Sequence, residues 1–233
     1  MKGIWENNWF MRPVSLFFGF GIAMALLVPY GDEILLLNDL RREPFIAIFK
    51  FFSWCGESWI WIVIGLAALF WRYRYTLLIA LTGLIIPFVF ILKDNVGMDR
   101  PITYFQKEGK IETLVTVPEV VLNTGQTSFP SGHTMSAFGL FSILALIAGR
   151  NGRKRVLLLA VLAISVGLSR VFLVQHFLVD VLGGALLGMV VSGFVWWVND
   201  RPYLQQKTWL DGRLTMPGRQ QTAKGADKPA AKS

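Results

Sequence analysis

The sequence predicts an all-α protein, a polytopic membrane helical bundle with about six transmembrane helices. Hydrophobic residues make up 54% of its 233 residues, and its mean hydropathy is +0.50. These values are too apolar for an ordinary soluble domain. The apolar residues also gather in about six segments, each near the roughly 20 residues that a helix needs to span a bilayer.

The six apolar segments follow one another along the chain. They lie at Val14–Tyr30, Trp54–Trp71, Thr76–Leu92, Thr134–Ala148, Val156–Val174 and Val179–Val198. The first follows Lys2 and Arg12, as the apolar part of a signal peptide would. It is long and lacks a convincing small-residue cleavage site, so we interpret it as a retained span. Phe45–Phe52 either extends the second span or lies at the membrane interface.

The distribution of charge predicts the orientation. Placing both termini in the cytoplasm puts 15 of the 23 lysines and arginines on that side, in agreement with the positive-inside rule. The net charge of +8 is then a topology and lipid-surface feature, and we expect no nucleic-acid partner. Residues 1–212 form the predicted transmembrane domain. Residues 213–233 form a basic tail that we expect to be disordered.

This topology places the polar motifs of the chain at the non-cytoplasmic ends of spans three to six. Segments that are distant in sequence therefore converge at one membrane depth. The loop from Pro101 to Pro130 must lie on the same side, where it is suited to cover the motifs. The stretch from Tyr30 to Pro44 is amphipathic, so we expect it to lie along the membrane surface.

Three cations accompany these span ends. Lys93 and Arg100 are seven residues apart, so they share a face if the third helix continues that far. Pro101 disfavours helix at Arg100 and predicts that the helix ends there. Arg170 adds a third cation near the end of the fifth span. Lys and Arg together suit a phosphate group, although one such residue alone is often only a membrane flank.

The segment Pro130-Ser131-Gly132-His133 precedes the fourth span directly. Ser131 is expected near the N-cap, where free backbone N–H groups and the helix dipole favour an anion. Gly132 allows the backbone to approach that anion closely. His133 would lie beside it, suited to protonate a leaving oxygen. A capped helix start explains the first three residues without any function, whereas the histidine points to chemistry.

The remaining motif is Ser169-Arg170, followed by His176 and Asp180. His176 and Asp180 are four residues apart and would be neighbours on one helical face. A carboxylate on one imidazole nitrogen fixes the tautomer and leaves the other nitrogen free to attack. Such pairs are common at helix starts, but an ionisable cluster at a membrane span is costly and usually functional.

Taken together, these residues are a complete set for phosphoryl transfer. Three cations and helix N–H groups would stabilise the phosphate oxygens, His176 would attack, and His133 would protonate the leaving group. The sequence contains no Cys/His pattern typical of a metal site, so we expect neither metal nor cofactor.

The three motifs, taken in order, resemble the signature of the type 2 phosphatidic acid phosphatase superfamily. The resemblance implies a helical core like that of the vanadium haloperoxidases, its distant relatives. It implies that His176 is the nucleophile, supported by Asp180, and that His133 assists the leaving group. It also implies phosphate binding by Lys93, Arg100, Ser131, Gly132 and Arg170, and activity without Mg²⁺.

The function we expect is therefore that of a lipid phosphatase in the bacterial inner membrane, with its site on the extracytoplasmic side. The resemblance suggests undecaprenyl pyrophosphate, phosphatidylglycerol phosphate, phosphatidic acid or lipid A phosphates as substrates. A lipid phosphotransferase would use the same phosphohistidine, and a non-catalytic scaffold would explain the spans but not the motifs. The sequence leaves the substrate and the oligomeric state open.

Overall fold

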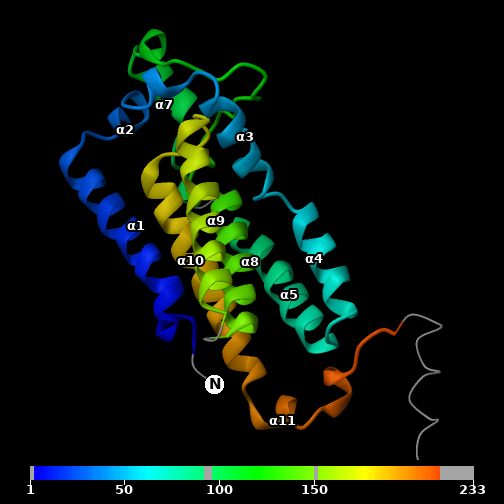
Figure 1. The fold of residues 1–233 in the computed structure, drawn as a ribbon. Helices are drawn as coiled ribbons and strands as arrows, with labels where there is room; N and C mark the ends of the chain where they lie inside the picture. Colours follow the sequence, from blue (N-terminus) through cyan, green and yellow to red (C-terminus); the bar gives the residue numbers. More distant parts are fainter. Residues whose placement is uncertain (1–2, 92–95, 150–151, 216–233) are drawn as a thin grey trace, which may run out of the picture.

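The computed structural model describes residues 3–91, 96–149 and 152–215, and these residues form helices and connecting loops without a strand. The longer helices lie side by side and form a bundle (Figure 1). They are α1 (Asn8–Leu27), α4 (Trp59–Leu69), α5 (Tyr73–Ile85), α8 (Gly132–Ala148), α9 (Arg153–Phe172) and α10 (Leu178–Asn199).

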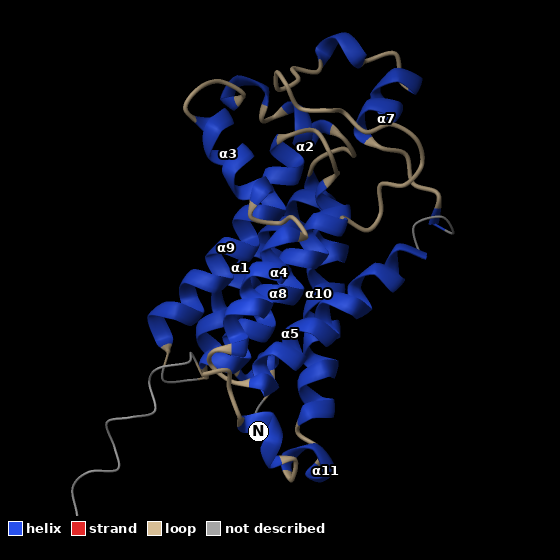
Figure 2. Cartoon of the chain, turned by 90° about the vertical axis from the view of Figure 1, so that its right-hand side faces the viewer, coloured by secondary structure: helices blue, strands red, loops and turns tan. Residues whose placement is uncertain are grey.

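Short helices cover the two ends of this bundle (Figures 1 and 2). One end carries α2 (Asp32–Leu35), α3 (Phe45–Trp54) and α7 (Pro101–Lys107), and the opposite end carries α11 (Pro202–Gln205). Single 3₁₀ turns accompany them at Ile4–Glu6, Asn38–Leu40, Ile86–Phe90, Ile111–Thr113 and Thr208–Asp211. The predicted all-α architecture is confirmed for the described residues.

Fewer of the described helices are long enough to cross a membrane than the six that the sequence predicted. Among the described helices, α1, α9 and α10 are long and apolar enough to cross a membrane, and the bent pair α3–α4 makes a fourth if it forms one span. The helix at Tyr73–Phe88 and α8 are apolar but shorter, at 10–17 residues. Six spans are therefore not confirmed, although each predicted segment overlaps one of these helices.

Two of the predicted segments have helix breaks with local causes. The second, Trp54–Trp71, has a break near its start, at residues 55–58, where α3 and α4 meet at an angle of 56°. A Cβ on Gly56 would lie 2.6 Å from Val166, so only glycine lets the chain bend this closely against α9. In the third segment α5 ends at Ile85 and a 3₁₀ turn follows, because Pro87 lacks the N–H that an α-helix needs there.

The centre of the bundle is the contact between α8 and α10, which depends on glycine. A Cβ on Gly184 would lie 2.5 Å from the carbonyl oxygen of Ser131. Along the same line, a Cβ on Gly188 would lie 2.8 Å from the backbone nitrogen of Gly139. The two backbones are therefore in direct contact, as small residues allow between membrane helices. This contact fixes the start of α8 against the start of α10.

The segment from Tyr30 to Pro44 exposes Asp39, Arg42 and Glu43 but directs one charged side chain into the protein. Arg41 is buried, and its guanidinium donates to the carbonyl oxygens of Phe172 (2.8 Å) and Ile34 (2.9 Å) and to Asn38 Oδ1. Burial lowers the pKa of Arg41 to about 10, which leaves it charged at neutral pH. Arg41 thus ties this segment to the last turn of α9, where a cation is favourable.

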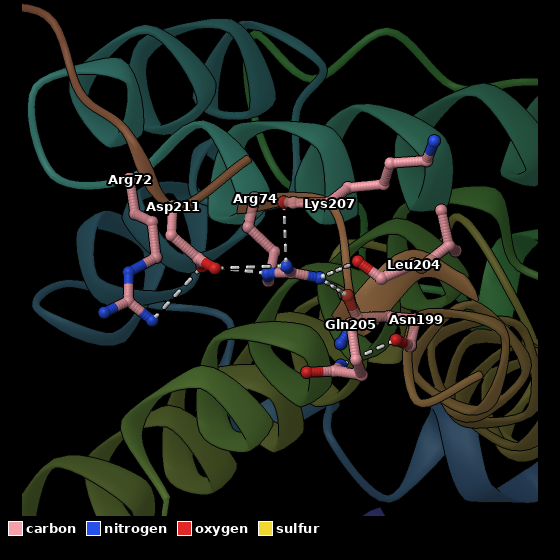
Figure 3. Close-up of polar contacts among 7 residues, drawn as sticks. All are labelled: Arg72, Arg74, Asn199, Leu204, Gln205, Lys207 and Asp211. Carbon is pink, nitrogen blue, oxygen red and sulfur yellow. Dashed lines mark hydrogen bonds and ion pairs between the residues drawn. The ribbon is translucent and has the colours of Figure 1, made fainter. Parts of the chain in front are cut away.

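At the opposite end of the bundle, the chain after α10 folds back against the start of α5, and Figure 3 shows the polar contacts that hold it there. The buried Arg74 guanidinium holds this segment through Asp211 (3.0 Å), Asn199 Oδ1 (3.1 Å) and the carbonyl oxygens of Leu204 (3.1 Å) and Lys207 (3.4 Å). The backbone of Leu214 also donates to the carbonyl oxygen of Leu69 (2.9 Å), two residues beyond the predicted end of the domain at 212. Residues 216–233 of the predicted tail lie outside the described part of the chain.

Replacing Arg74 with alanine should lower the stability of the protein by about 2 kcal/mol, because several charge-assisted hydrogen bonds are lost together. Thermal unfolding in detergent should show a melting temperature lower by roughly 4–8 °C. Arg72→Ala is the matched control, since half-exposed Arg72 makes a 3.6 Å ion pair with Asp211 and a cation–π contact with Tyr75 but no charge-assisted hydrogen bond among the described residues. Equal melting temperatures for the two variants would contradict this role of Arg74.

The stabilisation that the Arg74–Asp211 ion pair gives depends on pH with a known sign. The hydrogen bond from Arg74 holds the pKa of Asp211 below its ordinary value. The stabilisation is therefore present above the ordinary carboxyl pKa and is lost as the pH falls through the lowered value. The difference between wild type and Arg74→Ala should shrink accordingly in acid.

Candidate active site

The candidate site lies at the end of the bundle that carries α2, α3 and α7 (Figure 1). Helices α8 and α10 both begin there, α9 ends there, and the loop between α9 and α10 holds His176. Chain reversals thus bring the predicted motifs to one end of the molecule. The structure brings together Arg100, Ser131, Gly132, His133, Arg170, His176 and Asp180, while Lys93 lies outside the described residues.

The contact that defines the site is between Arg100 and His176. Nη1 of Arg100 lies 3.1 Å from Nε2 of His176, and both side chains are buried. A guanidinium has only N–H donors, so Nε2 must accept this bond and the ring proton must be on Nδ1. His176 is therefore the neutral tautomer with its Nε2 lone pair directed at the arginine.

Asp180 faces the other ring nitrogen. Its Oδ2 lies 3.4 Å from Nδ1 of His176, which is ion-pair range but longer than an ordinary hydrogen bond. The same oxygen accepts the backbone N–H of Phe177 (2.9 Å) and the hydroxyl of Ser128 (2.5 Å). A fully buried carboxylate held by two donors is suited to orient the imidazole and to stabilise positive charge on it.

The route by which His176 and Asp180 meet differs from the prediction. They do not share a helical face, because α10 begins at Leu178 and Asp180 is the third residue of the helix. His176 lies before the helix, in a turn closed by bonds from the N–H groups of Gln175 and His176 to the carbonyl oxygen of Arg170. Val174 has a φ of 58°, a rare conformation for a β-branched residue, so this turn is strained next to His176.

Arg100 is also placed differently from the prediction. It does not end the helix of the third segment: residues 97–100 are non-helical, and Arg100 is the N-cap of α7 with Pro101 at the first helical position. Its backbone N–H donates to Gly125 and its Nη1 to the carbonyl oxygen of Gln175 (2.9 Å). The idea that Lys93 and Arg100 share one helical face is therefore wrong for Arg100.

Two guanidinium nitrogens remain available to an anion. Burial lowers the pKa of Arg100, and the charge of Asp180 opposes that shift. The buried Nε of Arg100 and that of Arg170 have no hydrogen-bond partner among the described residues. Buried cationic donors without a partner are costly, and a phosphate oxygen would satisfy them.

Ser131, Gly132 and His133 lie at the start of α8. Ser131 is the N-cap residue at the predicted position, is fully buried, and donates its backbone N–H to the carbonyl oxygen of Asp180 (3.0 Å). Its hydroxyl accepts the hydroxyl of Thr134 (2.9 Å) rather than capping the helix. The free N–H groups of this helix start therefore remain available to an anion, next to half-buried His133.

Sequence reasoning missed several polar residues that hold the site. Ser53 in α3 accepts a hydrogen bond from Nη1 of Arg170, and Ser128 donates to Asp180. Gln175 accepts from Asn123 in the loop (2.7 Å) and donates to the carbonyl oxygen of Val121 (3.0 Å). Ser53 begins a polar stretch, residues 53–58, that follows Phe45–Phe52, and this stretch was a visible signal. Asn123 carried none, because its partner is distant in sequence.

An apolar groove of about 900 Å³ runs between α4 and α5 and reaches the start of α8. Its walls are mostly apolar, from Trp59, Trp61, Ile62, Leu66, Ile79 and Leu84. At its upper end it contacts Gly132, His133 and Ser136, and Ser136 accepts the indole N–H of Trp61 (2.7 Å). The polar residues at the start of α8 and an apolar groove are thus adjacent.

Comparison with known proteins agrees with this geometry. The family model of the PAP2 superfamily matches residues 71–203. Phosphatidylglycerophosphatase B of Bacillus subtilis (strain 168) is 31% identical over 204 residues, covering 78% of this chain and 94% of that protein. Lipid phosphate phosphatase 2 of Arabidopsis thaliana is 33% identical over 124 residues, covering 44% of this chain and 42% of that protein.

A solved structure shows the same fold. The crystal structure of Aquifex aeolicus LpxE superimposes with a TM-score of 0.58 at 20% identity, covering 72% of this chain and 94% of that one. The resemblance inferred from the three motifs is confirmed by these matches. The family match over most of the motif-bearing region, together with the near full-length relative, shows that the chain belongs to the PAP2 superfamily.

Proposed function

We propose that this protein is a membrane lipid phosphatase that acts through a phosphohistidine on His176. The observation that carries the proposal is the buried row Arg100–His176–Asp180, with Nε2 accepting from an arginine and Nδ1 facing a carboxylate. This row combines a neutral nucleophile, a group that orients it and a cation for phosphate oxygens. Those are the parts that phosphoryl transfer needs.

The reaction proceeds in two displacements. Nε2 of His176 forms the N–P bond as the bond between phosphorus and the lipid oxygen breaks, and His133 gives that oxygen a proton. Arg100, Arg170, Lys93 and the N–H groups at Ser131 and Gly132 hold the phosphate oxygens. Water then attacks phosphorus with His133 as base, which breaks the N–P bond and releases phosphate. The proposed chemistry requires no metal or other cofactor.

The groove between α4 and α5 supports a lipid substrate. Its apolar walls suit an acyl or prenyl chain, and its contact with His133 places the leaving oxygen of such a lipid beside the proposed proton donor. Phosphatidylglycerophosphatase B is named for a glycerophospholipid phosphate, and its similarity extends over 94% of its length. Phosphatidylglycerol phosphate is therefore the first substrate to test.

The proposed topology has both termini in the cytoplasm and the site on the extracytoplasmic side of the bacterial inner membrane. The support is the charge distribution. The starts of α5 and α9 and the end of α10 lie at the end of the bundle opposite the site (Figure 1), and the sequence at these helix ends carries Arg72, Arg74, Arg153, Arg155 and Arg201. In this arrangement α1, the α3–α4 pair, α5, α8, α9 and α10 make six crossings, two of them by short helices.

The test is release of phosphate from purified lipids by the protein in detergent, with and without EDTA. We expect release from phosphatidylglycerol phosphate or a related lipid, undiminished by EDTA, and slow release from a soluble sugar phosphate. Thin-layer analysis identifies the product that carries the phosphate. A newly phosphorylated lipid in place of free phosphate would indicate a phosphotransferase, and no release from any lipid would refute the proposal.

A further inference from the structure

Glu57 lies where the apolar groove meets the reaction centre. It belongs to the break between α3 and α4, and it lines the groove together with Gly132 and His133. The preceding residue, Gly56, lies beside the same helix start, since a Cβ there would be at ordinary contact distance, 3.5 Å, from the carbonyl oxygen of His133. The carboxylate is exposed to the groove rather than packed inside the protein.

The electrostatic setting of Glu57 is unusual for a structural residue. No described residue forms a hydrogen bond or an ion pair with its side chain. Its negative charge acts on the buried guanidinium of Arg170, which is one of the proposed phosphate ligands. An ionisable side chain inside an otherwise apolar segment is costly, so its presence points to a role in handling the substrate.

The position of Glu57 corresponds to the leaving-group side of the reaction. With the phosphoryl group at Arg100, Arg170 and His176 and the lipid chain in the groove, the connecting atoms must pass His133 and Glu57. When the substrate is a lipid monophosphate, the leaving group is a neutral alcohol, and hydroxyls near the leaving oxygen can donate to the carboxylate. When the substrate is a lipid diphosphate, the leaving group is the anionic lipid monophosphate, whose charge would face Glu57 directly.

We propose that Glu57 is a specificity-determining residue that selects lipid monophosphates over lipid diphosphates. The inference rests on the proposed function and deepens it. Selection acts by repulsion between the Glu57 carboxylate and the anionic leaving group of a lipid diphosphate. At low dielectric this repulsion disfavours the diphosphate more than an added contact would favour the monophosphate. The chemistry of either substrate is otherwise the same, with hydrolysis of one P–O bond by one water.

The experiment is a competition between a diacylglycerol-type monophosphate and a polyprenyl diphosphate in the same mixed micelles. The ratio of the two initial rates gives the ratio of kcat/KM values and does not depend on how much of the enzyme is active. We expect wild type to favour the monophosphate. Glu57→Gln should raise the relative rate on the diphosphate by about tenfold, and Glu57→Lys by more, because the charge is removed or reversed.

Two variants serve as controls. Glu57→Asp keeps the charge and should keep a ratio close to that of wild type. Glu112→Gln makes the same change of charge at an exposed residue of the loop that follows α7, outside the groove, and should leave the ratio unchanged. Raising the salt concentration should weaken the selectivity of wild type more than that of Glu57→Gln.

Unchanged ratios in Glu57→Gln and Glu57→Lys would overturn the inference. An equal loss on both substrates in Glu57→Gln would overturn it as well, because Glu57 would then serve turnover and not selection. If wild type releases phosphate from neither lipid, the proposed function itself fails. That result is distinct from wild-type activity with an unselective Glu57.

Discussion

Replacing His176 with alanine is expected to lower kcat by roughly 10⁴-fold or more, the range seen when a covalent nucleophile is removed. The variant loses Nε2, the atom that lies 3.1 Å from Nη1 of Arg100 and carries the lone pair. The cations and the groove remain, so binding of the lipid should change little. Phosphate release and substrate binding, measured separately on the purified variant, check both parts of the expectation.

The comparison with His133→Ala separates the two histidines. His133 is expected to act as the proton donor, whose removal costs about 10²–10⁴-fold for an alkoxide leaving group. An aryl phosphate with a low-pKa leaving group needs no such donor, so it should restore phosphoryl transfer in His133→Ala. It should not restore His176→Ala. Retention of full activity by His176→Ala, or its rescue by the aryl phosphate, would contradict a phosphohistidine on this residue.

Covalent trapping gives a further readout of the same step. Rapid quenching of wild type with labelled substrate should give an N–P linkage that is labile in acid and stable in base. His133→Ala should accumulate this species, because it lacks the base for the second displacement. His176→Ala should show none.

The fold was predictable to the extent that it depends on composition. Long apolar runs favour membrane helices whatever their neighbours are, so every predicted segment overlaps a helix. The ends of these helices depend on single residues. Gly56 permits the sharp bend against α9, and Pro87 interrupts the hydrogen bonds of the third segment. Hydropathy does not register either effect.

The candidate site was predictable to the extent that its residues carry chemistry. His176 and Asp180 were paired from their spacing, and they do meet, although through a strained turn before α10 and not along a helical face. The contacts of the supporting residues were not predictable. The polar stretch that begins at Ser53 is visible in the sequence, but its partner Arg170 is 117 residues away. Only the packing of α3 against α9 reveals that contact.

Asp180→Asn is expected to lower kcat by roughly 10³–10⁴-fold while KM changes little. Asparagine has almost the same shape, and its side-chain oxygen can still accept the N–H of Phe177 and the hydroxyl of Ser128. What it lacks is the negative charge 3.4 Å from Nδ1 of His176. That charge stabilises the imidazole as it becomes cationic on binding phosphorus, and it keeps the proton on Nδ1 so that Nε2 can attack.

Two further variants show which property of Asp180 matters. Ser128→Ala removes one donor from the same carboxylate oxygen and leaves its charge, so the loss should be only about tenfold, the worth of one hydrogen bond. Asp180→Ala removes the charge and also the bond to Phe177 that caps α10, so it should lose both turnover and thermal stability. If Asp180→Asn turns over like wild type, or if its loss is matched by Ser128→Ala, the carboxylate acts only by holding the helix start. His176 would then have to be oriented by Arg100 alone.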